Sequence, residues 1–398
     1  MNALRLAGAQ LLRKPLQTVL AVVLLALGIA TLVFVVIVHD QLSRQLTRDA
    51  AGVDLVVGAK GSPLQLILSS VYHIDVPTGN VALATVDQLR ANRLIAQVIP
   101  VSVGDNFQGF RIVGTEPALI EHYRGRLAAG TLWSAPMEAV LGADAARTTG
   151  LSVGSTFAGS HGLAAGGAAH EDARYRVVGV LMRTGTVLDR LIITDKASVW
   201  RAHEGEPTDA AERAVLEADR EVTALLVRYA SPLAAAIVPR QVNAESRLMA
   251  ASPANELARL FTVVGVGINT MRVFAAVLIA SSLLALFVTL YNALEERRYD
   301  IAIMRLLGAS RGRIVGLMLL EAWLLSAVAM VVGLIVGLAA VAVGSHWLSQ
   351  AWALSLSADV TPELLWLGVV AVAVATLAAL LPAWRAGRMN VAQTLSKR

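Results

Sequence analysis

The sequence predicts an integral membrane protein with four transmembrane α-helices and a large α+β domain inserted between the first and second spans. Four long apolar runs nearly lack charged residues, and each is long enough to cross a hydrocarbon core of roughly 30 Å. The region between the first and second runs holds no spanning run and mixes short β-branched stretches with short helical ones. Lys and Arg cluster beside the apolar runs, as the positive-inside rule requires.

Composition and charge narrow the class of protein. Of 398 residues, 56% are hydrophobic and 16% are charged, which is too apolar for one soluble globule and too charged in the middle for an all-membrane protein. Residues 1–17, 295–313 and 385–398 carry twelve Lys or Arg against three acids, a local net of +9, so the rest of the +5 chain is about −4. Basic charge placed beside apolar runs indicates membrane orientation and excludes a nucleic-acid-binding surface. The sequence has no cysteine, which excludes disulfides, thiol catalysis and cysteine-based metal sites.

The first apolar run, residues 18–38, is expected to be an uncleaved membrane anchor. It is longer than the roughly 7–15 apolar residues of a signal-peptide core and ends in His39-Asp40. The two tails and the segment between the second and third spans hold all twelve flanking Lys and Arg, whereas residues 345–363 hold none, so both termini are predicted to be cytoplasmic. The predicted segments are a cytoplasmic N-terminus 1–17, span 18–38, outer domain 39–272, span 273–294, cytoplasmic helix 295–313, span 314–344, outer loop 345–363, span 364–384 and cytoplasmic tail 385–398.

The insert 39–272 has the pattern of an α+β domain. Gly159–Arg174 is Gly/Ala-rich and His203–Arg220 is acidic, and both predict exposed loops. Ser252-Pro253 predicts the start of a helix that continues through Arg272 into the second span as one rod. The expected strands are Val53–Val57, Ala96–Val103, Phe110–Gly114, Tyr175–Leu181, Leu191–Thr194 and Val222–Arg228, and the expected helices are Val86–Arg93, Asp144–Gly150 and Asp195–Ala202.

Residues 295–313 form a basic hinge between the second and third spans. Ile301, Met304 and Leu307 fall on one face of a helix there, with the charged residues largely elsewhere. Gly308 suits a helix C-cap and Ser310 an N-cap of the next helix. Such an amphipathic helix can pass force from a partner at the membrane surface to both adjoining spans. The alternative is an interfacial helix that rests on lipid headgroups.

The sequence of this hinge resembles the FtsX-like permease domain of MacB-type ABC transporters. The stretch EERRYDIAIMRLLGAS from Glu295 to Ser310 is similar to the family pattern ERRxEIAILRALGAS, and Glu321-Ala322 and spaced glycines follow it. The family then has an Asp/Pro pair and Glu-Ala-Leu near its end, where this chain has Asn390–Leu395, so no role is carried over to the tail. Shorter similarities lie at Arg13–Thr18, Leu151–Ser155, Tyr175–Val180 and Pro382–Arg388.

The resemblance implies a non-catalytic permease subunit in the bacterial inner membrane, with a MacB-type periplasmic domain. It implies a separate cytoplasmic ATPase dimer that binds ATP and Mg²⁺, a second permease copy in a homodimer or heterodimer, and a periplasmic adaptor or substrate-carrying protein. The chain has no Walker A pattern, so no nucleotide cofactor is expected in it. The resemblance assigns ATPase coupling to the hinge residues Arg297, Arg298, Tyr299, Ile301, Met304, Arg305 and Leu307.

Three functions are compatible with this resemblance. The first is export or extraction of a hydrophobic, lipid-linked or peptide-like substrate through a periplasmic conformational change. The second is a signalling permease that regulates a periplasmic enzyme such as a murein hydrolase, and the third is lipoprotein release. A neighbouring gene for a membrane-fusion protein, a murein hydrolase or a lipoprotein carrier would distinguish the three.

Three residues inside the third span have expected roles. Glu321 is the only charge there, and a carboxylate at the bilayer centre costs about 2.5–3.5 kcal/mol on insertion scales. We expect it either near the surface, paired with Arg305 or Arg311, or at the joint between hinge and span. Gly333 and Gly337 form a small-xxx-small face that permits close helix packing, for dimerisation or helix sliding.

Two segments of the outer domain allow more than one interpretation. Residues 62–80 are unusually apolar and are either core or a hydrophobic patch that touches a lipid-like or peptide substrate. His161 and His170 lie nine residues apart on a Gly-rich stretch, where a zinc site is the alternative to a flexible polar loop, but no tight ligand spacing supports a metal. No catalytic triad or paired-carboxylate motif stands out in the insert.

Overall fold

The computed structural model describes residues 15–162, 169–204, 219–352 and 364–388. Within them the chain forms two compact units. Residues 15–41, 264–346 and 364–388 form a helical unit, and residues 42–263 with 347–352 form an α/β unit. Most of the predicted loop His203–Arg220, most of the outer loop 345–363 and the tail beyond residue 388 lie outside the described residues.

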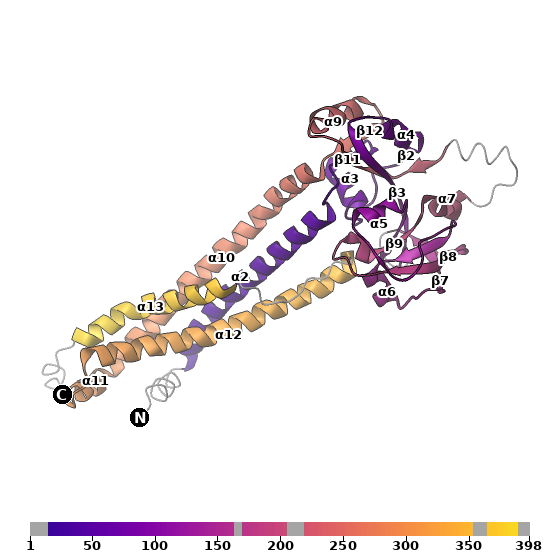
Figure 1. Cartoon of the computed structure of the whole chain (residues 1–398). Helices are drawn as coiled ribbons and strands as arrows, with labels where there is room; N and C mark the ends of the chain where they lie inside the picture. The colour runs from indigo at the N-terminus through magenta and orange to yellow at the C-terminus, as the bar shows by residue number, and fades with distance from the viewer. Residues whose placement is uncertain (1–14, 163–168, 205–218, 353–363, 389–398) are drawn as a thin grey trace. The chain divides into compact units, whose positions relative to one another are not determined.

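Long apolar helices build the helical unit (Figure 1). They are α2 (Pro15–Asp49), α10 (Pro253–Glu296), α12 (Arg311–Trp352) and α13 (Leu365–Arg388), with the short α11 (Arg298–Leu306) between α10 and α12. All four long helices are long and apolar enough to cross a membrane. The α/β unit lies between the first and second of them in the chain, which confirms the predicted fold class. The predicted rod is also confirmed, because α10 runs unbroken from Pro253 to Glu296.

A stripe along α2 lies at the centre of the helical unit. Every fourth residue from Ala21 to Ile37 is at most 1% exposed, and the stripe packs with apolar residues of α10, α12 and α13 in one cluster. The outward face of α2 is apolar as well, since Val19 and Leu20 are more than half exposed. A helix that is apolar all round suits a lipid environment.

One large sheet organises the α/β unit. The strands are β1 (Leu55–Ala59), β2 (Val81–Ala82), β3 (Ile95–Phe107), β4 (Phe110–Thr115), β5 (Leu127–Gly130), β6 (Glu138–Leu141), β7 (Thr156–His161), β8 (Ala169–Leu181), β9 (Leu191–Asp195), β10 (Glu221–Val222), β11 (Ala224–Tyr229) and β12 (Leu248–Ala251). The ten-stranded sheet has the order β12-β1-β11-β3-β4-β9-β6-β8-β5, with β7 paired to β3 and β8, and β10 pairs separately with β2. The pairs β4–β9 and β6–β8 are parallel, and the other pairs are antiparallel.

Short helices connect these strands. They are α3 (Pro63–Ser70), α4 (Ala84–Arg90), α5 (Ala118–His122), α6 (Ala143–Thr149), η1 (Val187–Arg190, a 3-10 helix), α7 (Lys196–Glu204) and α9 (Ala234–Ala244). Each predicted strand overlaps an observed strand, and each predicted helix overlaps α4, α6 or α7. The predicted loop Gly159–Arg174 is wrong in part, because β7 and β8 extend into it and pair through Ser160 and Ala169. Its Gly and Ala residues carry little β-propensity, so the pattern concealed these strand ends.

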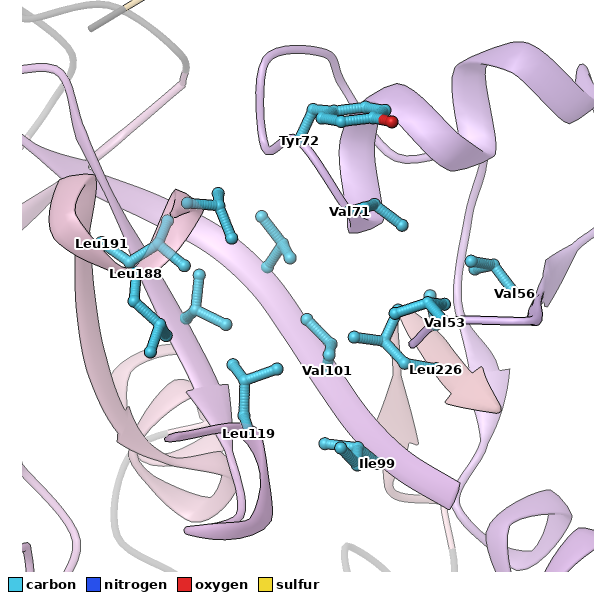
Figure 2. Close-up of a cluster of buried hydrophobic side chains, with 14 of the residues drawn as sticks. Val53, Val56, Val71, Tyr72, Ile99, Val101, Leu119, Leu188, Leu191 and Leu226 are labelled. Atoms are coloured by element: carbon cyan, nitrogen blue, oxygen red, sulfur yellow. The ribbon is translucent and has the colours of Figure 1, made fainter. Parts of the chain in front are cut away.

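The core of the α/β unit lies on both faces of the sheet. Successive side chains of a strand point to opposite faces, and β3 shows this clearly. Ile99, Val101 and Val103 enter the main apolar cluster, whereas Val98 enters a second cluster with Trp200. Figure 2 shows Ile99 and Val101 with other members of the main cluster around the β3 ribbon.

The apolar segment 62–80 belongs to this main cluster. Ser62 caps α3 by accepting a hydrogen bond on Oγ from the Gln65 backbone N–H at 3.4 Å, and a proline occupies the first turn. Leu66, Ile67 and Tyr72 are each 1% exposed and pack in the main cluster. The core interpretation is therefore confirmed for the part from Leu66 to Tyr72, whereas Val76 is 52% exposed.

Candidate functional site

The hinge helix α11 ends in the way that its sequence predicts. The Ala309 backbone N–H donates to the Met304 carbonyl at 2.9 Å and the Gly308 N–H to the Arg305 carbonyl at 3.1 Å, which is a Schellman motif. Gly308 adopts a φ of +95°, a conformation that glycine takes without steric cost. Ser310 then caps α12, because its Oγ accepts a hydrogen bond from the Arg313 N–H at 3.3 Å. Both predicted caps are confirmed.

One face of α11 packs against its own helical unit. Ile301 is 6% exposed and Ala302 is fully buried, and Met304 lies partly buried beside them. We call this group the hinge cluster; its other members are Leu294 of α10, Ile314, Val315 and Met318 of α12, and Ala383 and Ala386 of α13. Ile301 and Met304 thus pack inward while Leu307 is exposed, so the three residues do not share one face as expected. Because α11 is apolar on two opposite faces, periodicity alone could not show which of them packs inward.

The opposite face of α11 is apolar and exposed. Its residues are Tyr299, Ile303, Leu306 and Leu307, and we call them the outer face of α11. Leu306 is 66% exposed and Leu307 is 82% exposed. At 100° per residue, Tyr299 and Ile303 lie about 160° from Ile301, and Leu306 and Leu307 lie about 140° and 120° from it. An exposed apolar patch on a short helix marks a surface that contacts another protein or lipid.

The charged residues of the hinge have different environments. Arg298 Nη1 lies 3.0 Å from Glu295 Oε2, and both side chains are more than a third exposed. Such an i,i+3 pair contributes only about 0.3–0.5 kcal/mol. Arg305 is half-buried. Arg298 is thus more accessible to a partner than Arg305.

Arg297 forms the buried ion pair of the hinge. Its Nη1 lies 3.1 Å from Glu321 Oε1, with the carboxylate side chain 4% and the guanidinium side chain 16% exposed. Arg297 is the residue between α10 and α11, so Glu321 lies at the joint between hinge and span. The expected partners Arg305 and Arg311 are wrong as partners of this pair. Glu321 follows Arg311 by ten residues, about 15 Å along α12, whereas Arg297 reaches it from the end of α10.

Gly333 and Gly337 pack α12 against α2 of the same chain. A Cβ atom at Gly333 would lie 2.7 Å from the Ala26 carbonyl oxygen, and one at Gly337 would lie 2.8 Å from Val33 Cβ. The predicted close packing is confirmed, and its partner is α2 within the chain. Within the chain, this glycine face is therefore occupied by α2.

The outer end of α2 is anchored inside the α/β unit. Arg190 Nη2 lies 3.0 Å from Asp49 Oδ2, and Asp49 is fully buried. Tyr123 donates its hydroxyl hydrogen to the Asp49 carbonyl at 2.6 Å, and Tyr72 donates to the Leu46 carbonyl at 3.1 Å. Burial raises the pKa of Tyr72 and of Tyr123, so both keep the hydrogen that they donate. The last carbonyls of a helix lack partners within it, and these tyrosines supply them.

Sequence reasoning missed this anchor because it ended the first helix with the apolar run at residue 38. The signal was present: residues 39–51 contain no Gly or Pro, and Gly52 follows them. A helix is therefore free to continue well past its apolar part. The hydroxyls and the guanidinium that hold it come from distant parts of the chain and could not be assigned by pattern.

The possible metal site is only partly described. His161 Nδ1 lies 3.4 Å from Asp105 Oδ1, and the His161 side chain is exposed. The side chain of His170 lies outside the described residues. Within the described ranges, no group of three or more His, Cys, Asp or Glu residues could hold a metal ion.

Two protein-family models match this chain, each over a different part of it. The FtsX-like permease C-terminal family matches residues 272–391. The MacB-like periplasmic core domain matches residues 18–245, more than half of the chain. The chain belongs to the FtsX-like permeases with a MacB-like periplasmic core domain. It is thus a multi-pass membrane protein with a periplasmic domain, and a permease of the MacB/FtsX type of ABC transporter. This family of typically non-catalytic membrane subunits implies partner ABC ATPase subunits.

Two solved structures are similar to part of this permease. The periplasmic region of MacB from Actinobacillus actinomycetemcomitans matches with 10% identity and a TM-score of 0.36, over 54% of this chain and 95% of that one. The extracellular domain of the noncanonic ABC-type transporter YknZ from Gram-positive bacteria matches with 10% identity and a TM-score of 0.31, over 49% and 98%. No curated protein sequence gives a significant match.

Proposed function

We propose that this permease couples ATP hydrolysis by a separate cytoplasmic ATPase to a conformational change of its periplasmic domain. The change exports or extracts a hydrophobic, lipid-linked or peptide-like substrate. The observation that carries the proposal is the two-faced helix α11. Its inner face is packed against α10, α12 and α13 in the hinge cluster, while its outer face is exposed and apolar. A helix built in this way can receive a partner on one side and move three long helices on the other.

The outer face of α11 is the proposed ATPase contact. Leu306 and Leu307 would enter an apolar groove of the ATPase, since buried apolar anchors carry most of the energy of an interface. Arg298 and Arg305 would meet acids at the rim, where charges contribute orientation more than affinity. Arg297 has a different role, because it is paired with Glu321. ATP and Mg²⁺ are held by the partner in this proposal, and α11 and both termini lie in the cytoplasm.

The proposed transmission runs along continuous helices. The ion pair of Arg297 and Glu321 carries a movement of α11 to α12. The glycine face at Gly333 and Gly337 couples α12 to α2. Helix α2 ends in the anchor at Asp49. Helix α10 begins at Pro253, and Leu257 near its start packs in the main cluster of the periplasmic domain. Both helices that enter the periplasmic domain are therefore fastened within its core.

A charge placed on the outer face tests the proposal. Leu307→Asp should abolish capture of the ATPase subunit by the permease in lipid nanodiscs, and the permease alone should hydrolyse no ATP. Leu233→Asp is the matched control, because Leu233 is an exposed leucine (61%) of the periplasmic domain. It should leave ATPase capture unchanged. Full ATPase capture by Leu307→Asp would mean that α11 is an interfacial helix that rests on lipid. In a separate experiment, mass spectrometry of the amphiphiles that co-purify with the parent permease in native lipid would identify the substrate.

A further inference from the structure

The periplasmic domain contains a cavity of about 650 Å³ that the coupling mechanism does not use. One wall is the end of α2 with the turn that follows it, from Arg48 to Gly52. The opposite wall is the end of α5 with the next turn, from Glu121 to Arg124. Arg228 of β11 completes the charged part of the lining. All of these residues belong to the α/β unit.

Positive charge dominates this lining. Arg48, Arg124 and Arg228 supply three guanidinium groups, and Glu121 is the only carboxylate among the lining residues. The hydrogen bonds of the Arg48 side chain go to neutral acceptors, the Arg44 carbonyl at 3.3 Å and Gln45 Oε1 at 3.2 Å. Within the described part of the chain, the guanidinium groups of Arg124 and Arg228 form no ion pair. The pocket thus holds a net charge of 3 − 1 = +2 that its own lining does not neutralise.

Two further polar groups at or beside the pocket already have hydrogen-bond partners. His122 Nε2 lies 2.9 Å from the Ala51 carbonyl oxygen, so Nε2 carries the hydrogen that is donated. Burial lowers the pKa of His122, which leaves the ring neutral at neutral pH. Nearby Asp54 accepts a hydrogen bond on Oδ2 from the Tyr229 backbone N–H at 2.7 Å. Arg48, Arg124 and Arg228 are the positively charged groups of the lining, and they are the donors suited to an anionic ligand.

Two residues of the pocket have unusual backbone conformations, and one of them lies close to the His122 ring. Gly52 has a φ of +78°, and a Cβ atom there would lie 2.9 Å from His122 Cε1. Arg124 has a φ of +54°, which is uncommon for a residue with a side chain. Two residues of the lining, Gly52 and Arg124, thus have left-handed backbone conformations. The cavity has the size of a site for a small ligand.

We propose that this arginine pocket binds a phosphate group. Guanidinium is planar, always charged, and forms paired hydrogen bonds with phosphate oxygens. A net lining charge of +2 matches a phosphate dianion. The group can belong to the headgroup of an amphiphile or to a free phosphate compound, and both present the same oxygens. The inference does not depend on ATPase coupling, because the pocket lies wholly within the periplasmic domain.

Binding is measured on the full chain in phosphatidylcholine nanodiscs, without an ATPase partner. Isothermal titration calorimetry uses two probes: inorganic pyrophosphate, and dihexanoyl phosphatidic acid below its critical micelle concentration. We expect saturable binding, weakened about tenfold by Arg124→Gln and by Arg228→Gln, and weakened further by added KCl. Arg240→Gln is the matched control, because Arg240 is exposed on α9 and does not line the pocket. It should leave the affinity unchanged.

The two probes separate the two sources of phosphate. Equal, arginine-dependent binding of both probes supports a free phosphate group as sufficient ligand. Arginine-dependent binding of the phosphatidic acid alone supports a lipid headgroup. The proposal is overturned if neither probe saturates, or if Arg240→Gln weakens binding as much as the pocket variants do. Thermal unfolding of each variant checks that the domain remains folded.

Discussion

Arg297 Nη1 lies 3.1 Å from Glu321 Oε1, and this contact joins the end of α10 to a point ten residues inside α12. The carboxylate is almost fully buried and the guanidinium mostly so. A buried pair of this kind contributes little net stability compared with well-packed apolar residues, but losing one partner is costly. Its value here is geometric, because it sets the register between two consecutive long helices.

Removing Arg297 should therefore destabilise the chain far more than removing its neighbour. We expect Arg297→Ala to cost about 3 kcal/mol, because Glu321 would be left charged without a partner. Arg298→Ala, which breaks only an exposed i,i+3 pair, should cost less than about 0.5 kcal/mol. Denaturant unfolding in nanodiscs measures both. The double variant Arg297→Met/Glu321→Leu should recover most of the loss, and equal costs for the two single variants would contradict this account.

The glycine face of α12 should not tolerate a methyl group. Gly333→Ala places a Cβ 2.7 Å from a backbone oxygen of α2, so the two helices must separate, at a cost of about 1–3 kcal/mol. Gly368→Ala on α13 is the control, because no atom lies within 4 Å of its Cβ position. That change should be neutral or stabilise by up to about 1 kcal/mol through helix propensity. Thermal unfolding compares the two variants, and similar losses in both would show that the contact is unimportant.

Met304 and Leu307 should respond differently to the same substitution. Met304→Asp puts a carboxylate into the hinge cluster and should lower the stability of the permease alone by at least about 2 kcal/mol. Leu307→Asp changes an 82% exposed side chain and should leave that stability within about 0.5 kcal/mol. Unfolding of the permease without ATPase is the measurement. If Met304→Asp is as stable as the parent, Met304 does not pack inward in solution.

The stability of the periplasmic domain should fall in acid because of His73. Burial, with Arg111 and Arg190 nearby, lowers the pKa of this imidazole to about 3. Between pH 6.5 and about 3 the unfolded chain binds a proton here that the folded chain does not. The contribution of His73 to the free energy of unfolding is therefore fully present above pH 6.5. It falls by about 1.4 kcal/mol for each pH unit below that value, down to the folded-state pKa.

The variant His73→Asn isolates this contribution. Asparagine tolerates the left-handed φ of 56° at this position and does not titrate. Between pH 6.5 and 4.5 the free energy of unfolding should fall less steeply with decreasing pH for the variant than for the parent. Hydrogen bonds from Ser134 and Arg176 lower the pKa of Glu138 to about 2, so protonation of Glu138 affects stability mainly below this window. An identical slope for both proteins would exclude His73 as the source.

Local patterns were enough for much of this protein. The apolar runs were long enough to predict four spanning helices, because length and composition decide whether a helix can cross a membrane. Gly308 and Ser310 predicted the end of α11 and the start of α12, because caps depend on residues within one turn. The β-branched stretches of the insert predicted its strands, because strand propensity also depends on residues that are close together in sequence. The order of residues in the hinge, from Glu295 to Ser310, was also sufficient to indicate the family.

Tertiary structure decided which neighbours these elements have. Helical periodicity showed that α11 has apolar residues, but only packing showed that Ile301 lies inward and Leu307 outward. Glu321 is the only charged residue of its span and required a partner. The fold pairs it with Arg297, although Arg311 is nearer in sequence. The glycines at 333 and 337 indicated close packing, and the fold assigned them to α2. A sequence pattern specifies the face of an element, whereas its partner depends on chain segments far apart in sequence, which only the folded chain brings together.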